Sequence, residues 1–200
     1  EYIYRISQQI KGVTPQLLKN ETVSVLASAR KRVEIGKGRP TIIVGERINP
    51  TGKKKLQENL REQRLDKVLD LALEQVESGA EILDVNVGMP GINEKETMVK
   101  VIELLSSRTD VPLCIDSSSP EVIEAALRIY PGRALINSIS AEKSKMERLL
   151  PIAAKYGSMF VLLPLDDRGV PQEAKTRCTL IEKVYNEAQQ HGLKKSDVLV

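Results

Sequence analysis

The sequence predicts an α/β protein built on a parallel (β/α)8 barrel. Short runs rich in Val, Ile and Leu show little alternation with polar residues, as expected of strands buried on both faces. Segments with apolar residues at helical spacing separate these runs. Strict alternation of strands and helices requires right-handed crossovers and a parallel sheet. At 200 residues the chain is long enough to bury a substantial core.

The expected strands follow one another from residue 41 onward. They are 41–45, 81–87, 111–115, 134–139, 159–165 and 197–200. A complete barrel needs eight strands and typically about 250 residues. We therefore expect residues 41–200 to form the first five βα units and the sixth strand of a barrel that is incomplete at its C-terminal end.

Apolar stripes between the strands predict the helices. The stripes cover residues 65–76, 98–105, 122–127, 146–153 and 180–188. Ser119 and Pro120 supply an N-cap and a first-turn proline for the third of these helices. A doubly wound dinucleotide-binding sheet is disfavoured, because the segment from Glu46 to Gly52 lacks the glycine pattern that brings a backbone against phosphates.

The first forty residues have a different character and predict a helix and a linker. Thr14-Pro15 is a helix-start signal, and the flexible, basic segment 36–40 places the boundary of the barrel after residue 40. This part holds eight Lys and Arg residues against three Glu, so the remainder of the chain is slightly acidic. The apolar stripe of the expected helix consists of Leu17, Leu18, Val23, Val25 and Leu26.

Composition argues against several classes of function. Aromatic residues make up only 3% of the chain and the basic excess is confined to one end, so nucleic acid is not an expected partner. No apolar stretch of about 18 residues and no leader-like start occur, which argues against a membrane or secreted protein. Cys114, Cys178 and the single His191 are far apart, so we expect no bound metal and a cytoplasmic location.

Polar residues lie within or just after the expected strands, toward the end where the active sites of parallel barrels gather. They are Glu46, Asn49, Asp84, Asn86, Asp116 and Asn137. Carboxylates and amides together suit a neutral, flat heterocycle with N–H donors and ring-nitrogen acceptors, such as an aminopyrimidinone. The alternative is that these side chains only cap helices or form Asx turns, an interpretation favoured for Asp166 and Asp167.

The first loop also carries Gly52, Lys53 and Lys54. A run of lysines is usually solvated surface, but at the rim of a barrel it could hold the carboxylate tail of a ligand whose ring lies deeper. Cys114 alternates with buried neighbours and is predicted to be a core residue.

Four segments resemble the methyltetrahydrofolate-binding domain of cobalamin-dependent methionine synthase. They are 45–52 (Gly-Glu-Arg-Ile-Asn-Pro-Thr-Gly), 84–88 (Asp-Val-Asn-Val-Gly), 114–118 (Cys-Ile-Asp-Ser-Ser) and 130–138 (Tyr-Pro-Gly-Arg through Ile-Asn-Ser). Corrinoid iron-sulfur protein methyltransferases share these strings. Dihydropteroate synthases share the barrel and the pterin site, but their first loop is less similar to residues 49–52.

The resemblance implies a methyltransferase that moves the N5-methyl group of methyltetrahydrofolate to the cob(I)alamin of a corrinoid domain or protein in methionine synthesis. Residues 1–40 would then be the end of a preceding homocysteine-binding barrel. Asp116 and Asn137 would hydrogen-bond the pterin ring, and an amide beyond Val200 would stabilise protonated N5.

The remaining site roles are also implied by the resemblance. Glu46 and Asn49 would line the same pocket, Asp84 and Asn86 would lie in it or behind it, and the Gly52–Lys54 loop would approach the folate. Two alternatives stay open. One is a dihydropteroate synthase-like enzyme, which would bind p-aminobenzoate and a pterin pyrophosphate, and the other is a non-catalytic barrel that recognises a partner.

Overall fold

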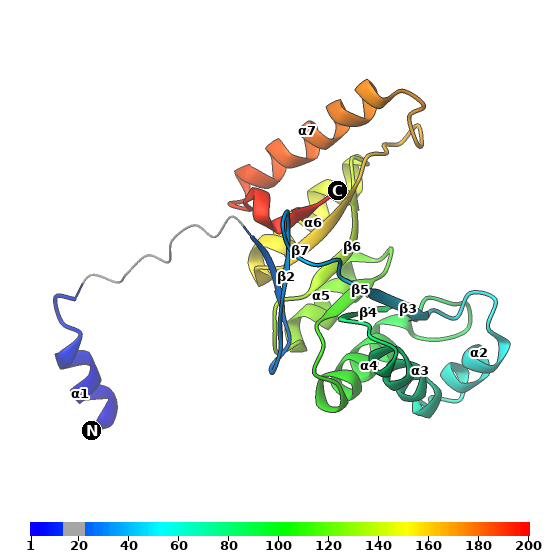
Figure 1. The fold of residues 1–200 in the computed structure, drawn as a ribbon, viewed down its shortest axis with the longest axis horizontal. Helices are drawn as coiled ribbons and strands as arrows, with labels where there is room; N and C mark the ends of the chain where they lie inside the picture. The colour runs from blue at the N-terminus through cyan, green and yellow to red at the C-terminus, as the bar shows by residue number, and fades with distance from the viewer. Residues whose placement is uncertain (14–22) are drawn as a thin grey trace.

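A computed structural model of the chain describes residues 1–13 and 23–200. Its main feature is a parallel sheet of six strands in the order β3-β4-β5-β6-β7-β8 (Figure 1). The strands are β3 (Val44–Ile48), β4 (Ile82–Val85), β5 (Leu113–Asp116), β6 (Leu135–Ser140), β7 (Met159–Leu163) and β8 (Val198–Leu199). Sequential strands are therefore neighbours, as in a barrel, and the predicted α/β class with a parallel sheet is confirmed.

Helices connect successive strands. They are α2 (Lys54–Arg61), α3 (Asp66–Glu77), α4 (Glu94–Arg108), α5 (Pro120–Ile129), α6 (Lys143–Tyr156) and α7 (Ala174–Gln190), with the 3-10 turn η1 (Lys195–Asp197) before β8. The five expected helices are present, and the Ser119 hydroxyl accepts a hydrogen bond from the Val122 amide as a cap should. Helix α2 was not predicted, although Leu56 and Leu60 bury one face of it at helical spacing.

The first strand lies further along the chain than the sequence predicted. Apolar residues begin at position 41, but β3 spans Val44–Ile48, so Glu46 lies within the strand and not after it. An apolar run shows where a strand can form, but hydrogen-bonded pairing with β4 determines which residues form it. That pairing is irregular between Gly45 and Ile48.

Alternating side chains give the sheet two different faces. One face packs against the helices in a large apolar core that includes Leu83, Ile115 and Ile136. The other, inner face is apolar only near the amino ends of the strands. There Ile82 and Cys114 belong to a smaller cluster with Leu135, Met159, Leu26 and Val33.

An antiparallel hairpin of β1 (Ser24–Ala27) and β2 (Arg32–Ile35) covers this lower end of the inner face (Figure 1). Its Leu26 side chain is 0% exposed within the smaller cluster. The helical stripe expected through Val25 and Leu26 is thus wrong, because alternate side chains of a strand seal the barrel. Thr14-Pro15, Leu17 and Leu18 lie outside the described residues.

The segment 130–133 fastens the hairpin to the sheet. The Tyr130 hydroxyl donates to the Ala27 carbonyl at 3.0 Å and accepts from the Leu113 amide at 3.1 Å. Arg133 donates to the Val25 carbonyl and to Asp197, at 2.8 and 2.5 Å. These contacts give part of the recognised Tyr-Pro-Gly-Arg string a structural role. The hairpin therefore packs with the barrel, although the expected boundary at residue 40 separates the two.

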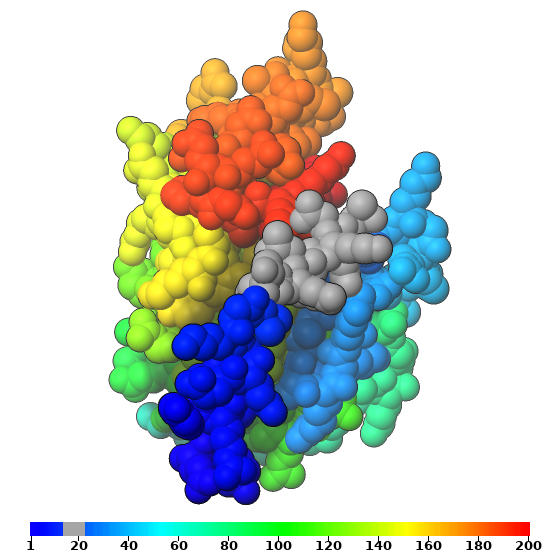
Figure 2. All heavy atoms as spheres, turned by 90° about the vertical axis from the view of Figure 1, so that its left-hand side faces the viewer, coloured from blue at the N-terminus to red at the C-terminus, as the bar shows by residue number. Residues whose placement is uncertain are grey.

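Helix α1 (Tyr2–Gln9) stands away from the barrel in Figure 1, and in Figure 2 it lies on the side that faces the viewer. All of its side chains are exposed, including Tyr2 and Ile3. None of the described helices combines the length and the apolar character needed to cross a membrane.

Candidate functional site

Four polar side chains gather at the upper end of the inner face, where β4, β5 and β6 end. The Asn86 amide donates to Asp116 Oδ2 at 2.9 Å, and the Asn137 amide donates to Asp84 Oδ1 at 3.1 Å. Asp116 and Asn137 are also direct register partners across β5 and β6. The sequence prediction that these residues share one site is consistent with this geometry, while their roles toward a ligand stay proposals.

The two carboxyl groups lie in surroundings that disfavour their ionised forms. Burial raises the pKa of Asp84, and the hydrogen bond from Asn137 only partly offsets this effect. Burial likewise raises the pKa of Asp116, with Glu46 and Glu94 adding electrostatic repulsion. Glu46 also acts on Asp84, which places its carboxylate near both aspartates. The cluster is acidic, yet its two aspartates are easier to protonate than exposed carboxyl groups.

Asp84 has an unused acceptor. Its side chain is 2% exposed, and Oδ2 has no hydrogen-bond partner of good geometry among the described residues. The neighbouring Cys114 thiol, on the register partner of Asp84, is at most a weak donor. An unsatisfied buried carboxylate oxygen is costly unless a ligand donates to it, so Asp84 Oδ2 is suited to receive an N–H group.

The first loop does not join this hydrogen-bonded cluster. Asn49 Oδ1 accepts from the Thr51 amide at 3.0 Å, which is the Asx turn that the sequence left open as an alternative. Gly52 follows with φ +72°, a conformation that favours glycine. Lys53 donates to the Arg47 carbonyl at 2.8 Å, and Lys54 is exposed at the start of α2. These residues lie beyond the carboxyl end of β3, at the rim and not against the four polar side chains.

Two further residues support the cluster and were not singled out in the sequence. The Ser117 hydroxyl, on a residue that is 6% exposed, donates to Glu94 Oε1 at 2.6 Å. Glu94 is the first residue of α4, where an acidic side chain is favoured by the helix dipole whatever its function, so the sequence carries no separate signal for it. Asp166, by contrast, pairs with Arg168 in a tight turn, in line with the turn expected there.

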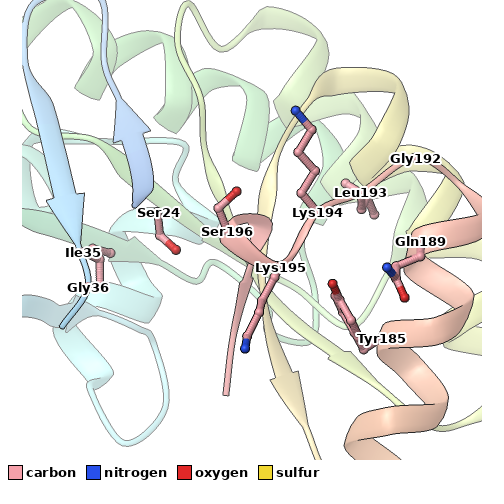
Figure 3. A pocket seen from close by; sticks show the side chains of 10 residues that line it. All are labelled: Ser24, Ile35, Gly36, Tyr185, Gln189, Gly192, Leu193, Lys194, Lys195 and Ser196. Carbon is pink, nitrogen blue, oxygen red and sulfur yellow. The ribbon is translucent and has the colours of Figure 1, made fainter. Parts of the chain in front are cut away.

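A larger cleft lies at the opposite end of the barrel (Figure 3). It has a volume of about 700 Å³, between the hairpin and the segment that joins α7 to β8. The labelled side chains include Ser24, Tyr185, Lys194 and Lys195. We place the candidate site at the polar cluster and not in this cleft, because converging buried polar groups with raised pKa values indicate ligand chemistry better than volume does.

Within the described residues, no group of three or more His, Cys, Asp or Glu side chains is arranged to hold a metal ion. The acidic cluster at the upper end is held together by amide donors. Its present partners suit hydrogen-bonded recognition of a ligand.

Comparison with known proteins finds a family whose model matches most of the chain. The family described as "Pterin binding enzyme" matches residues 45–200, which contain all four members of the cluster. Solved structures with the same fold include dihydropteroate synthases. The enzyme from Vibrio fischeri is 21% identical with a TM-score of 0.62, and the match covers 88% of this chain and 64% of that chain.

Two other dihydropteroate synthases give similar values. The one from Yersinia pestis, solved with a pterine-sulfa conjugate, is 24% identical with a TM-score of 0.61, covering 83% of this chain and 60% of that chain. The one from Xanthomonas albilineans, solved with 4-aminobenzoic acid, is 23% identical with a TM-score of 0.61, covering 89% and 64%. The chain thus spans less than two thirds of the length of these structures, and the likeness shows a shared fold.

The expectation of a methyltransferase is wrong by this comparison. The structural neighbours are dihydropteroate synthases, which belong to a pterin-condensing class and not to a methyl-transferring one. The physical reason is that strand-end Asp and Asn residues suit recognition of a flat heterocycle, and a pattern that predicts ring recognition does not report which bond is made next. The cobalamin, corrinoid and homocysteine-domain expectations stay untested predictions.

Proposed function

Because the chain belongs to the family of pterin-binding enzymes, we propose that it binds a reduced pterin at the polar cluster and serves a condensation of the dihydropteroate synthase type. The observation that carries this proposal is the partly buried set of acceptors and amides at the ends of β4, β5 and β6, with Asp84 fully buried among them. Structural neighbours of the condensing class support the choice of reaction.

A pterin ring matches the cluster group by group. Its aminopyrimidinone edge presents adjacent N–H donors, which a carboxylate can accept together, as well as ring nitrogens and a carbonyl that accept from amides. Asp116 is half-exposed at the end of β5 and faces Asn137 across the sheet. Asp84 Oδ2, deeper in the barrel, is free to accept a further N–H group. We propose that Asp116 and Asn137 contact the ring, with Asp84 and Asn86 beneath and beside them.

In the proposed reaction an arylamine nitrogen attacks the methylene carbon of a pterin pyrophosphate. A carbon–nitrogen bond forms, the carbon–oxygen bond breaks, pyrophosphate departs with the electron pair, and the amine releases a proton. Carboxylates that accept from the ring N–H groups increase the electron density of the ring, which stabilises positive charge developing on the methylene carbon. This is the contribution that Asp116 and Asp84 make from their positions in the barrel.

The first loop lies where the leaving group would emerge. Lys54 is exposed at the N-terminal end of α2, and Lys53 is the residue before this helix. A cation beside a helix N-terminus favours a phosphate anion. We therefore propose that Lys54 assists pyrophosphate binding, whereas Lys53, which already donates to the Arg47 carbonyl, mainly shapes the loop.

The binding test uses the intact protein titrated with 6-hydroxymethyl-7,8-dihydropterin. Asn137→Ala and Asp116→Asn should each weaken binding about tenfold or more, because each removes a hydrogen-bonding group from a desolvated site. The matched controls are Asn186→Ala on the exposed face of α7 and Asp110→Asn just before β5, both of which should bind as the wild type does. Unchanged affinity in both site variants would contradict the proposed site.

The reaction test supplies the pterin pyrophosphate and p-aminobenzoate together. Formation of dihydropteroate with release of one pyrophosphate for each product supports the condensing activity. Binding of the pterin without any product in the intact protein would contradict that activity while leaving pterin recognition standing.

A further inference from the structure

The loop between β4 and α4 is attached at both of its ends to two consecutive residues of β5 and its extension. Asn86, at the start of the loop, donates to Asp116 Oδ2. Glu94, at its end, accepts from the hydroxyl of Ser117. The orientation of Asp116 therefore depends on two contacts with the same loop, one direct and one through the next residue.

Ser117 also takes part in a second hydrogen bond. Its hydroxyl oxygen also accepts from the Ser119 amide at 3.1 Å, so the single oxygen holds the β5–α5 turn and the start of α4 together. Gly88, in the loop, lies close to the side chains of both Asn86 and Glu94. A Cβ there would lie 3.3 Å from Asn86 Oδ1 and 3.6 Å from Glu94 Oε1. The Glu94 carboxylate thus lies between Gly88 and the Ser117 hydroxyl.

We propose that Glu94 is a positioning residue for Asp116, acting through Ser117 to hold the end of β5 in the orientation that the pterin ring requires. This inference rests on the proposed pterin site. It assigns Glu94 no contact with the ring itself.

The charge of Glu94 gives the proposal a measurable signature. Repulsion from Glu94 adds to the burial that raises the pKa of Asp116. The other ionisable groups that act on Asp116 are Glu46 on β3, Asp84 on β4 and the thiol of Cys114 on its own strand. Because ionised Asp116 is the form that accepts two N–H donors, removing the Glu94 charge should move the midpoint of pterin binding to lower pH.

Three variants separate orientation from charge in titrations with 6-hydroxymethyl-7,8-dihydropterin across the acidic range. Glu94→Gln keeps an oxygen that can accept from Ser117. At pH values above the midpoint of the binding curve its affinity should stay within about twofold of the wild type, while the midpoint itself should move to lower pH. Ser117→Ala keeps the charge but breaks the link, so affinity should drop about tenfold. Glu94→Ala removes both the charge and the acceptor for Ser117, so it should lower the midpoint pH and also weaken binding.

Two controls make the outcome specific. Glu96→Gln removes an exposed carboxylate from the same turn of α4 and should change neither quantity. In an Asp116→Asn background, Glu94→Gln should no longer move the midpoint. If the wild type fails to bind the pterin, the proposed function falls and this inference with it. If the wild type binds, Asp116→Asn weakens binding and all three variants behave like Glu96→Gln, only the positioning role is overturned.

Discussion

The two ends of the barrel's inner face are built from the same strands but from opposite chemistry. Near the amino ends the inward side chains are apolar and a hairpin seals them, whereas two residues further along β4, β5 and β6 they become acidic or amide groups. The paired positions are Ile82 and Asp84, Cys114 and Asp116, and Leu135 and Asn137. Alternation with a period of two therefore lets one strand contribute to stability at its lower end and to recognition at its upper end.

The energetic consequences of the two ends should differ in sign. Apolar groups at the lower end gain free energy when they leave water, and the hairpin completes that burial. Carboxyl groups at the upper end lose hydration and are incompletely compensated, as the raised pKa values of Asp84 and Asp116 indicate. A change at the lower end should cost stability without altering recognition, and a change at the upper end should do the reverse.

The largest effect is expected at the lower end. Leu26→Ala should reduce the free energy of unfolding by about 2–5 kcal/mol, because the side chain is fully buried between the hairpin and the sheet and leaves a cavity. Chemical denaturation monitored by circular dichroism measures this change. Val25→Ala, on the same strand but half-buried, is the matched control and should cost less than about 1 kcal/mol.

Pterin binding tests whether the lower and upper ends of the inner face act independently. Under conditions where Leu26→Ala remains folded, its affinity for the pterin should equal that of the wild type. A loss of affinity as large as that of Asn137→Ala would show that the hairpin and the polar cluster are not independent.

At the upper end, a smaller change in the free energy of unfolding is expected, opposite in sign to that of Leu26→Ala. Asp116→Asn should raise the free energy of unfolding at neutral pH by about 1 kcal/mol, since it removes a charge that burial disfavours and keeps an oxygen to accept from Asn86. Thermal denaturation at several pH values measures it, with Asp110→Asn as the control for an exposed aspartate.

The sign of the pH dependence follows from the raised pKa of Asp116. In the wild type Asp116 costs nothing below the ordinary carboxyl pKa of 3.8, where it is protonated in both the folded and the unfolded protein, and the cost grows as the pH rises from 3.8 to the higher pKa of Asp116 in the folded protein. The advantage of Asp116→Asn should therefore be full at neutral pH and shrink as the pH falls toward 3.8. An advantage that is constant across this range would contradict desolvation as its cause.

Local patterns predicted much of this arrangement. Buried runs located the strands because parallel strands covered on both faces are apolar throughout, and strand-end position alone grouped Asp84, Asn86, Asp116 and Asn137. The topology makes β5 and β6 neighbours, and their carboxyl ends meet at one edge of the sheet. In the structure this brings Asp116 opposite Asn137. These features depend on neighbours in the sequence or on the next strand.

Features that depend on distant residues were missed. The hairpin was read as a helix because Val25 and Leu26 gave no separate strand signal, and their pairing with β2 and contact with Tyr130 are long-range. Glu94 looked like an ordinary first-turn residue, because its partner Ser117 lies on another loop. The reaction type was not decided by the sequence either, since methyl-transferring and condensing enzymes that bind pterins share the barrel and the pterin site, and the condensing enzyme was only an alternative.

The central claim is that a pterin binds where the polar cluster lies, and a crystal structure of the intact protein with 6-hydroxymethyl-7,8-dihydropterin tests it most directly. We predict that the ring lies at the carboxyl ends of the strands, within hydrogen-bond distance of Asp116 and Asn137. A ring seated instead in the cleft beside Tyr185 and Lys194, at the other end of the barrel, would contradict the account.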